Sequence, residues 1–226
     1  MRPVDPASIR TPADLAGLID HTLLAPGASR LDLARVCSEA RERRFATVCL
    51  YGDRLPEAVK LLEGSGVPAI AVVDFPKGEG TTAARVAEAV DVVAKGAGEV
   101  DVVVALPALL AGRFEAVLDD LRAVVGAVPV PVKVILETAA LTRDQIAAGA
   151  ALVRASGAAW VKTSTGFGPG GARVDHVALL RKVVGDALGV KASGGIRTAA
   201  DALAMVRAGA SRLGTSGGVS IVDGQF

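Results

Sequence analysis

The chain has few aromatic side chains for a protein of its hydrophobicity. Aromatic residues make up 3% of its 226 residues, whereas 51% are hydrophobic. A core built from Ala, Val, Leu and Ile is typical of buried parallel strands and the helices that cover them. The composition therefore predicts an α/β protein. The length fits one domain over residues 1–226, with an N-terminal extension or helix over residues 1–14.

Residues that bind metals or form disulfides are also scarce. The chain has two cysteines, Cys37 and Cys49, and two histidines, His21 and His176. Their number and spacing match neither a zinc site nor a disulfide framework, and they do not supply a hydrolase triad. The sequence therefore predicts no metal centre and a reducing compartment.

An excess of charge of one sign is missing, as are long apolar runs. Lys and Arg total 25 against 24 Asp and Glu, which disfavours a nucleic-acid surface. Residues 1–18 contain both charges and prolines, unlike the apolar core of a signal peptide, and no apolar run approaches ~18 residues. We expect a cytoplasmic protein that acts on a small molecule, with no nucleic-acid or membrane partner.

The chain does contain a regular alternation of short apolar runs and longer amphipathic segments, which recurs every ~25 to 30 residues. Eight such units favour a single (β/α)8 TIM barrel over an open doubly wound sheet, because no Gly-x-Gly-x-x-Gly follows the first strand. The predicted strands are residues 15–20, 46–50, 69–74, 99–105, 130–137, 159–163, 190–192 and 212–214. The predicted helices include residues 30–43, 81–95, 113–125, 142–155, 175–187 and 198–208.

Several charged residues fall on strand faces that should point into the barrel. In residues 131–137 the alternate valines and leucine form an aliphatic face that must meet the helices, so Lys133 points inward. The same alternation sends Asp101, Lys162 and Lys191 inward. Buried charge requires partners or a function, so these residues either balance a bound phosphate or take part in chemistry.

The pairing of Lys162 with Lys191 favours chemistry. The two residues lie on consecutive strands, ~5 Å apart in a barrel, where like charges lower each other's pKa. A lysine with a pKa of ~10.4 is neutral in roughly one molecule in 2,500 at pH 7. A neutral lysine can attack a carbonyl, the resulting imine accepts electrons, and Asp101 can move protons through water. The pattern predicts a Schiff-base aldolase.

Glycine-bearing segments follow the last three predicted strands, at residues 163–168, 192–195 and 214–218. Backbone amides exposed by glycine bind anions, and barrels frequently hold phosphate at this position. We therefore expect a phosphorylated substrate. Cys49 lines the same pocket in one interpretation and is a small buried hydrophobe in the other. The predicted pocket residues are Cys49, Lys133, Thr163, Gly166, Ser193, Gly194, Gly195, Gly214, Thr215 and Ser216.

These residues lie in segments that resemble the deoxyribose-phosphate aldolase family. The resemblance covers almost the whole chain and is most specific at residues 161–166 and 190–198. It implies cleavage of 2-deoxy-D-ribose 5-phosphate to D-glyceraldehyde 3-phosphate and acetaldehyde, in a cytoplasmic role in deoxynucleoside catabolism. It also implies Lys162 as the imine-forming lysine, Lys191 as the neighbour that lowers its pKa, and Asp101 as the acid that works with water. It further implies no metal or organic cofactor, and a homodimer or homotetramer.

The chain departs from the family pattern at four places. Ala25 stands where Lys is frequent, and Leu106 lies in a loop where Asn and Gly are frequent. Gly217 replaces a common Ser, and the chain ends in Phe226 where some members have a Tyr. The three proposed catalytic residues are unaffected.

Two other functions fit the same barrel. A phosphosugar isomerase would use a carboxylate base such as Glu137 and would need no neutral lysine. A non-catalytic barrel that binds a phosphorylated metabolite would keep its lysines charged. Neither function explains the pairing of Lys162 with Lys191.

Overall fold

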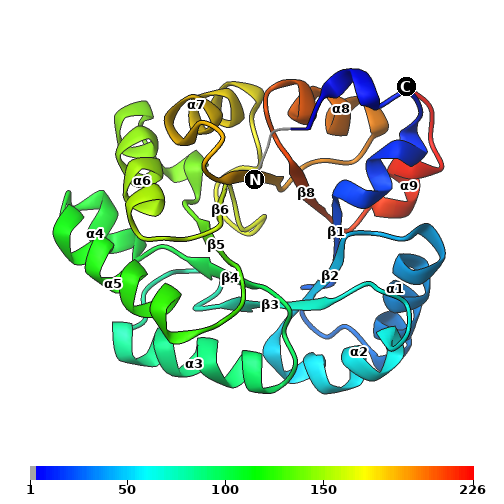
Figure 1. Cartoon of the computed structure of the whole chain (residues 1–226), viewed down its shortest axis with the longest axis horizontal. Helices are drawn as coiled ribbons and strands as arrows, with labels where there is room; N and C mark the ends of the chain where they lie inside the picture. The colour runs from blue at the N-terminus through cyan, green and yellow to red at the C-terminus, as the bar shows by residue number, and fades with distance from the viewer. Residues whose placement is uncertain (1–3) are drawn as a thin grey trace.

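The computed structural model describes residues 4–226 as eight parallel strands closed into one barrel, with each strand paired to the next and β8 paired to β1 (Figure 1). The predicted (β/α)8 barrel is confirmed, and the open sheet is wrong. The strands are β1 Ile19–Thr22, β2 Thr47–Leu50, β3 Ala69–Val73, β4 Val100–Val103, β5 Val132–Ile135, β6 Trp160–Lys162, β7 Gly189–Ser193 and β8 Arg212–Thr215.

Helices surround the barrel and alternate with its strands (Figure 1). All six helical stretches named from the sequence are present, and three short helices (α2, α4 and α9) join them. None of the helices within residues 4–226 has the length and apolar character needed to cross a membrane. The α-helices are α1 Arg30–Arg43, α2 Leu55–Leu62, α3 Thr82–Ala94, α4 Leu106–Leu110, α5 Phe114–Ala127, α6 Arg143–Ala155, α7 Val174–Val184, α8 Ala199–Arg207 and α9 Gly218–Val222.

The first predicted strand, residues 15–20, is wrong over most of its length. Residues Pro12–Leu18 form the 3-10 helix η2, and β1 begins only at Ile19. The reason is local: the Asp14 carboxylate accepts hydrogen bonds from the backbone N–H groups of Arg10 and Thr11, which caps a helical turn. The helix η2 packs against α9, near the C-terminus (Figure 1). The extension predicted for residues 1–14 contains a further turn, η1 (Pro6–Ser8), and its residues 1–3 lie outside the described residues.

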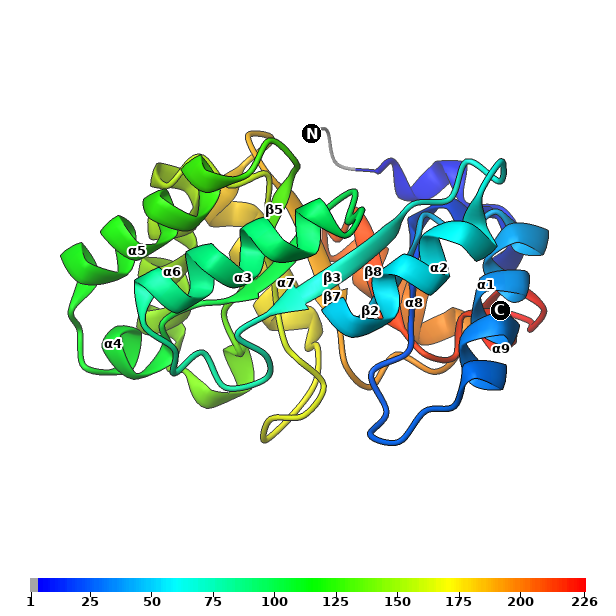
Figure 2. The same ribbon diagram turned by 90° about the horizontal axis from the view of Figure 1, so that it is seen from below.

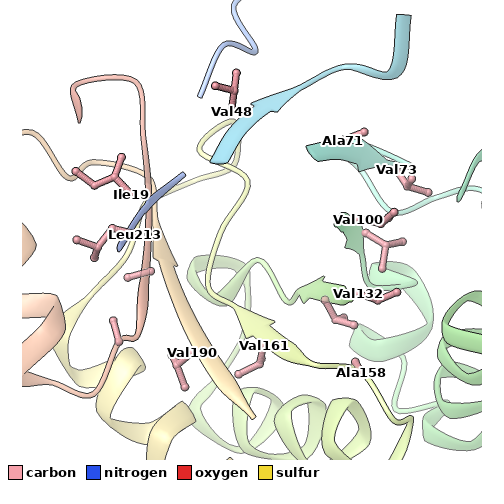
Figure 3. Close-up of a cluster of buried hydrophobic side chains, with 14 of the residues drawn as sticks. Ile19, Val48, Ala71, Val73, Val100, Val132, Ala158, Val161, Val190 and Leu213 are labelled. Carbon is pink, nitrogen blue, oxygen red and sulfur yellow. The ribbon is translucent and has the colours of Figure 1, made fainter. Parts of the chain in front are cut away.

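The aliphatic face of each strand packs against the helices. Alternate residues such as Val100, Val132, Val161 and Val190 are fully or almost fully buried in one continuous apolar layer (Figure 3). Burial of apolar area at roughly 25 cal/mol per Å² makes this layer the main source of stability. The predicted strand alternation is therefore confirmed, and the opposite face is left to line the barrel interior.

The two ends of the barrel differ. The loops after β1 and β6 project from one side of the molecule, while the N-terminal segment lies on the other (Figure 2). Near the N-terminal ends of the strands the interior is filled by Trp160, which is 1% exposed. Gly189 is its partner on β7, and a Cβ there would lie 2.0 Å from Cε3 of the Trp160 ring. The indole thus occupies the space that a side chain at position 189 would need.

Gly189→Ala is expected to destabilise the barrel by about 1 to 3 kcal/mol, because the added methyl group forces Trp160 or the β7 backbone to move. The measurement is the free energy of unfolding in urea. Gly126→Ala is the control, since a Cβ there meets nothing within 4 Å on α5, and it should be neutral or stabilise by up to about 1 kcal/mol. Equal effects of the two substitutions would contradict this account.

Candidate active site

Asp101 is the centre of a cluster of buried charges inside the barrel. Its Oδ1 accepts a hydrogen bond from Lys133 Nζ at 2.6 Å. Its Oδ2 accepts hydrogen bonds from Lys162 Nζ at 2.9 Å and from Lys191 Nζ at 2.6 Å. All four side chains are at most 4% exposed. The four residues that the strand alternation sent inward thus meet at one carboxylate.

Three further residues extend this cluster into a closed ring of alternating charge. Lys133 pairs with Glu99 at 2.5 Å, and Lys191 pairs with Asp20 at 2.5 Å. Arg212 pairs with Asp20 at 2.7 Å and with Glu99 at 3.6 Å, which closes the circuit. We call this the charge ring, and its members in order are Glu99, Lys133, Asp101, Lys191, Asp20 and Arg212.

The charge ring contains three carboxylates and three cations, so its formal charges cancel. Lys162 is attached to it only through Asp101, whose Oδ2 it shares with Lys191. A proton on Lys162 therefore adds a positive charge that has no carboxylate of its own within the ring. Among the buried amines of this cluster, Lys162 is the one that gains least from being charged.

The pKa values of the two paired lysines move in opposite directions. Burial lowers the pKa of Lys162; Asp101 opposes this effect, and Lys191 adds to it. Burial would also lower the pKa of Lys191, but Asp101 and Asp20 raise it above its usual value. Repulsion from Lys191 thus lowers the pKa of Lys162 in the predicted direction, although burial is the larger cause. The expectation that the pKa of Lys191 is lowered as well is wrong, because its two carboxylate partners outweigh burial and repulsion.

Asp101 itself stays ionised. Burial alone would raise the pKa of its carboxyl group, but Lys133, Lys162 and Lys191 together lower it well below its usual value. The carboxylate can therefore accept a proton or hold a cation, and it donates a proton only after it has received one.

A cavity of about 720 Å³ lies at the carboxyl ends of the strands, among the loops that follow β1, β6, β7 and β8. Five of the ten predicted pocket residues line it: Gly166, Gly194, Gly195, Thr215 and Ser216. Its other lining residues were not predicted individually, although Thr165, Phe167 and Gly217 lie in the glycine-bearing segments that were expected to bind an anion. These other residues are Thr22, Leu23, Leu24, Ala25, Pro26, Thr165, Phe167, Ile196, Arg197, Gly217 and Ser220.

Arg197 brings a positive charge to this cavity. It follows the Gly194-Gly195-Ile196 segment directly, and its backbone N–H donates to the Asp201 carboxylate at the start of α8. A cation two residues after a glycine pair was the signal that could have identified it. Together with the glycine-bearing loops, Arg197 makes the cavity suitable for an anion.

Residues 15–222 match the family described as DeoC/LacD family aldolase. The chain belongs to this family. It is 46% identical to the deoxyribose-phosphate aldolase of Thermoanaerobacter sp. (strain X514), over 93% of this chain and 96% of the relative. It is 47% identical to that of Carboxydothermus hydrogenoformans, over 93% of this chain and 94% of the relative. The tetrameric structure of deoxyribose phosphate aldolase from Aeropyrum pernix matches with a TM-score of 0.87 at 34% identity, covering 94% of this chain and 91% of that chain.

The family membership makes the chain an aldolase, which is a lyase. Three of the predicted pocket residues, Thr163, Ser193 and Gly214, do not line the cavity. Ser193 N donates to Thr163 Oγ1 at 3.1 Å, and Ser193 Oγ donates to the Ser164 carbonyl at 2.5 Å. A Cβ on Gly214 would lie 2.8 Å from Ser193 Cβ and 3.0 Å from Lys191 Cε. These residues hold the aldolase loops and leave room for Lys191.

Cys49, on β2, lies among apolar side chains inside the barrel. It packs with Leu24, Ile70 and Val72, and it is 1% exposed. Burial raises the pKa of its thiol, so the neutral form is favoured. Cys49 therefore contributes to an apolar wall of the barrel interior and is not among the residues that line the cavity.

Glu137 holds the loop that follows β6. Its carboxylate accepts hydrogen bonds from the Thr165 N–H at 3.1 Å and from the Thr165 hydroxyl at 2.5 Å. The Phe167 N–H in turn donates to Thr165 Oγ1, which places Phe167 at the cavity wall. Glu137 is 3% exposed and is not among the residues that line the cavity. Its role in the described structure is to shape the aldolase loop.

Asp101→Asn is expected to lower the free energy of unfolding by about 3 kcal/mol, because it removes the carboxylate that balances buried cations. Urea unfolding at neutral pH measures this loss. Asp119→Asn is the matched control, since Asp119 is an exposed residue of α5, and it should change stability by less than about 0.5 kcal/mol. If the two variants were equally stable, Asp101 would not hold the cluster together.

Proposed function

We propose that this aldolase cleaves 2-deoxy-D-ribose 5-phosphate to D-glyceraldehyde 3-phosphate and acetaldehyde through an imine on Lys162. The observation that carries the proposal is the position of Lys162 as the one amine attached to a charge ring that is already balanced. Burial lowers the pKa of this amine, which increases the neutral, nucleophilic fraction. The names of the similar proteins support the same substrate.

In the first step the neutral Nζ of Lys162 attacks the aldehyde carbon C1 of the open-chain sugar. The carbinolamine that forms takes up a proton from water and loses its oxygen as a water molecule, which leaves a positively charged iminium ion. Asp101 Oδ2 lies 2.9 Å from Nζ before the reaction, so it is placed to stabilise this new charge.

In the second step the hydroxyl group on C3 loses its proton and the bond between C2 and C3 breaks. The electron pair of that bond moves into the iminium group and gives an enamine, while C3 leaves as the aldehyde of D-glyceraldehyde 3-phosphate. Protonation of the enamine at C2 and hydrolysis then release acetaldehyde and restore Lys162. Asp101, working through water, accepts the first proton and returns it to C2, and Lys191 holds its carboxylate in place.

The cavity at the barrel mouth is the proposed site of the 5-phosphate. Gly166, Gly194, Gly195 and Ser216 line its wall, and we expect their backbone amides to bind the anion; Arg197 supplies charge. Of the remaining predicted residues, Thr215 lines the same cavity, while Lys133 acts through the charge ring. Binding the phosphate here directs the reactive end of the sugar down into the barrel, toward Lys162.

The isomerase alternative is weaker in this geometry. Its base would be Glu137, but both hydrogen bonds described for that carboxylate hold Thr165 in the β6–α7 loop. A barrel that only binds a phosphorylated metabolite would give no role to a buried amine with a lowered pKa. Both alternatives predict that no covalent adduct forms on Lys162.

We also propose that the enzyme acts in the cytoplasm as a homo-oligomer and needs no metal or organic cofactor. The tetrameric structure of the Aeropyrum pernix protein supports an oligomer, either a homodimer or a homotetramer. The absence of a cofactor follows from the mechanism, because the imine itself accepts the electrons that a metal would otherwise stabilise.

Reduction with borohydride in the presence of acetaldehyde is expected to attach a two-carbon group to Lys162. Mass spectrometry of the peptides measures the added mass and its position. Lys162→Met should lose the adduct and lower kcat/KM for 2-deoxyribose 5-phosphate by about 10³-fold or more. The Lys162→Met variant should stay folded, because the charges of the ring cancel without Lys162.

Lys182→Met is the matched control, since Lys182 is an exposed lysine of α7. It should keep both the adduct and the activity. An adduct on Lys191 in place of Lys162, or cleavage without any adduct, would reject the imine on Lys162. Loss of activity in Glu137→Gln with retention in Lys162→Met would favour the isomerase.

Arg197→Met is expected to raise KM for 2-deoxyribose 5-phosphate by about tenfold to hundredfold, as the loss of one charge-assisted hydrogen bond predicts. The kcat/KM for unphosphorylated 2-deoxyribose should stay nearly constant, because that substrate has no group for Arg197 to bind. Steady-state kinetics with both sugars measures the difference. Arg207→Met, at the exposed end of α8, is the control. An equal loss with both sugars would place the phosphate elsewhere.

A further inference from the structure

Two members of the charge ring lie at the end of the barrel that is opposite the cavity. Glu99 immediately precedes β4, and Arg212 is the first residue of β8, whereas Lys162 is the last residue of β6. The Arg212 guanidinium stacks over the Trp160 ring, with its central carbon 4.9 Å from the ring centroid. Neither Glu99 nor Arg212 lines the cavity. Both are therefore remote from the proposed position of the substrate.

Each of these residues nevertheless forms ion pairs that complete the charge ring. Glu99 is a carboxylate partner of Lys133, and Arg212 joins Glu99 to Asp20. With both present, the ring has three charges of each sign. Removal of Arg212 would leave the ring with one net negative charge, and removal of Glu99 would leave it with one net positive charge.

We propose that Glu99 and Arg212 set the charge on Lys162 from the closed end of the barrel, by fixing the net charge of the ring to which Lys162 is attached. They act through Lys133, Asp20 and Asp101, so they are positioning residues that do not touch the substrate. The inference rests on the imine mechanism proposed above, since only that mechanism requires a neutral Lys162.

The groups that face Lys162 directly come from three strands. They are Asp101 on β4, Lys191 on β7 and Cys49 on β2, with burial as the largest influence on its pKa. Burial keeps the Cys49 thiol neutral, so it contributes little charge. A substitution at Glu99 or Arg212 alters none of these three groups, so a remote effect can be separated from a direct one.

The sign of the effect follows from the charge that remains. A ring that lacks Arg212 is negative and stabilises a proton on Lys162, so the pKa of Lys162 should rise. A ring that lacks Glu99 is positive and repels that proton, so the pKa of Lys162 should fall. For unit charges roughly 10 Å apart in an effective dielectric of about 20, the shift is about one pH unit. Solvent contact at the partly exposed Glu99 and Arg212 side chains should reduce it somewhat.

The test is the pH titration of the Lys162 side chain by NMR in protein labelled with ¹³C-lysine, with the resonance assigned by its absence in Lys162→Met. Arg212→Met should raise the titration midpoint, Glu99→Gln should lower it, and the double variant should return close to the original value. Arg212→Lys, which restores the charge, should also return close to it. Loosening of the barrel would let water in and shift both single variants in the same direction.

The matched controls are Arg122→Met and Glu115→Gln, which make the same changes of charge at exposed positions of α5. Midpoint shifts of the same sign in the two ring variants, or shifts no larger than those of the controls, would overturn the proposal. If Arg212→Met does not fold, the downward shift in Glu99→Gln decides the outcome. The titration needs no substrate, so failure of the imine mechanism would appear separately, as a missing borohydride adduct on Lys162.

Discussion

The interaction on which the rest of the structure depends is the shared use of the Asp101 carboxylate by three buried lysines. An isolated charge in a barrel interior would cost several kcal/mol, and the usual solution is to fill the interior with aliphatic side chains. Here the charges alternate around a closed ring, so each carboxylate meets cations on both sides. The interior can then be polar because the stabilising apolar layer lies outside the strands, against the helices.

This arrangement divides the barrel into a structural end and a reactive end. Trp160 packs into the space left by Gly189, and Arg212 stacks over its ring, so the structural end is closed by one large side chain. At the reactive end, Gly214 leaves room for the Lys191 side chain to reach Asp101 and Asp20. Loops held by internal hydrogen bonds, such as those from Thr165 to Glu137, surround the cavity above. Tight packing at the structural end and hydrogen-bonded loops at the reactive end keep the amine buried, and burial is what lowers its pKa.

The eight recurring strand and helix units were sufficient to predict the fold. The alternation of side chains along each strand was sufficient to predict the meeting of Asp101, Lys162 and Lys191, because it fixes which face each side chain occupies. It could not identify Glu99 and Arg212 as members of one ring, since their contacts depend on the height of each residue along the barrel and on the closure of β8 against β1. The error at residues 15–20 arose because the capping interaction of Asp14 overrides an apolar pattern. Arg197 and the residues of the β1–α1 loop were missed because a loop sequence has no periodicity from which the direction of a side chain can be predicted.

The charge ring also explains why a neutral amine, and not a charged one, suits the proposed reaction. If Lys162 were an ammonium group at rest, Asp101 would stabilise its charge equally before and during the reaction, and the rate would gain nothing. With a neutral Lys162, the positive charge first appears at the iminium ion, close to a carboxylate that is already ionised and held by Lys133 and Lys191. The electrostatic stabilisation is then greater for the intermediate than for the free enzyme, which is the condition for catalysis.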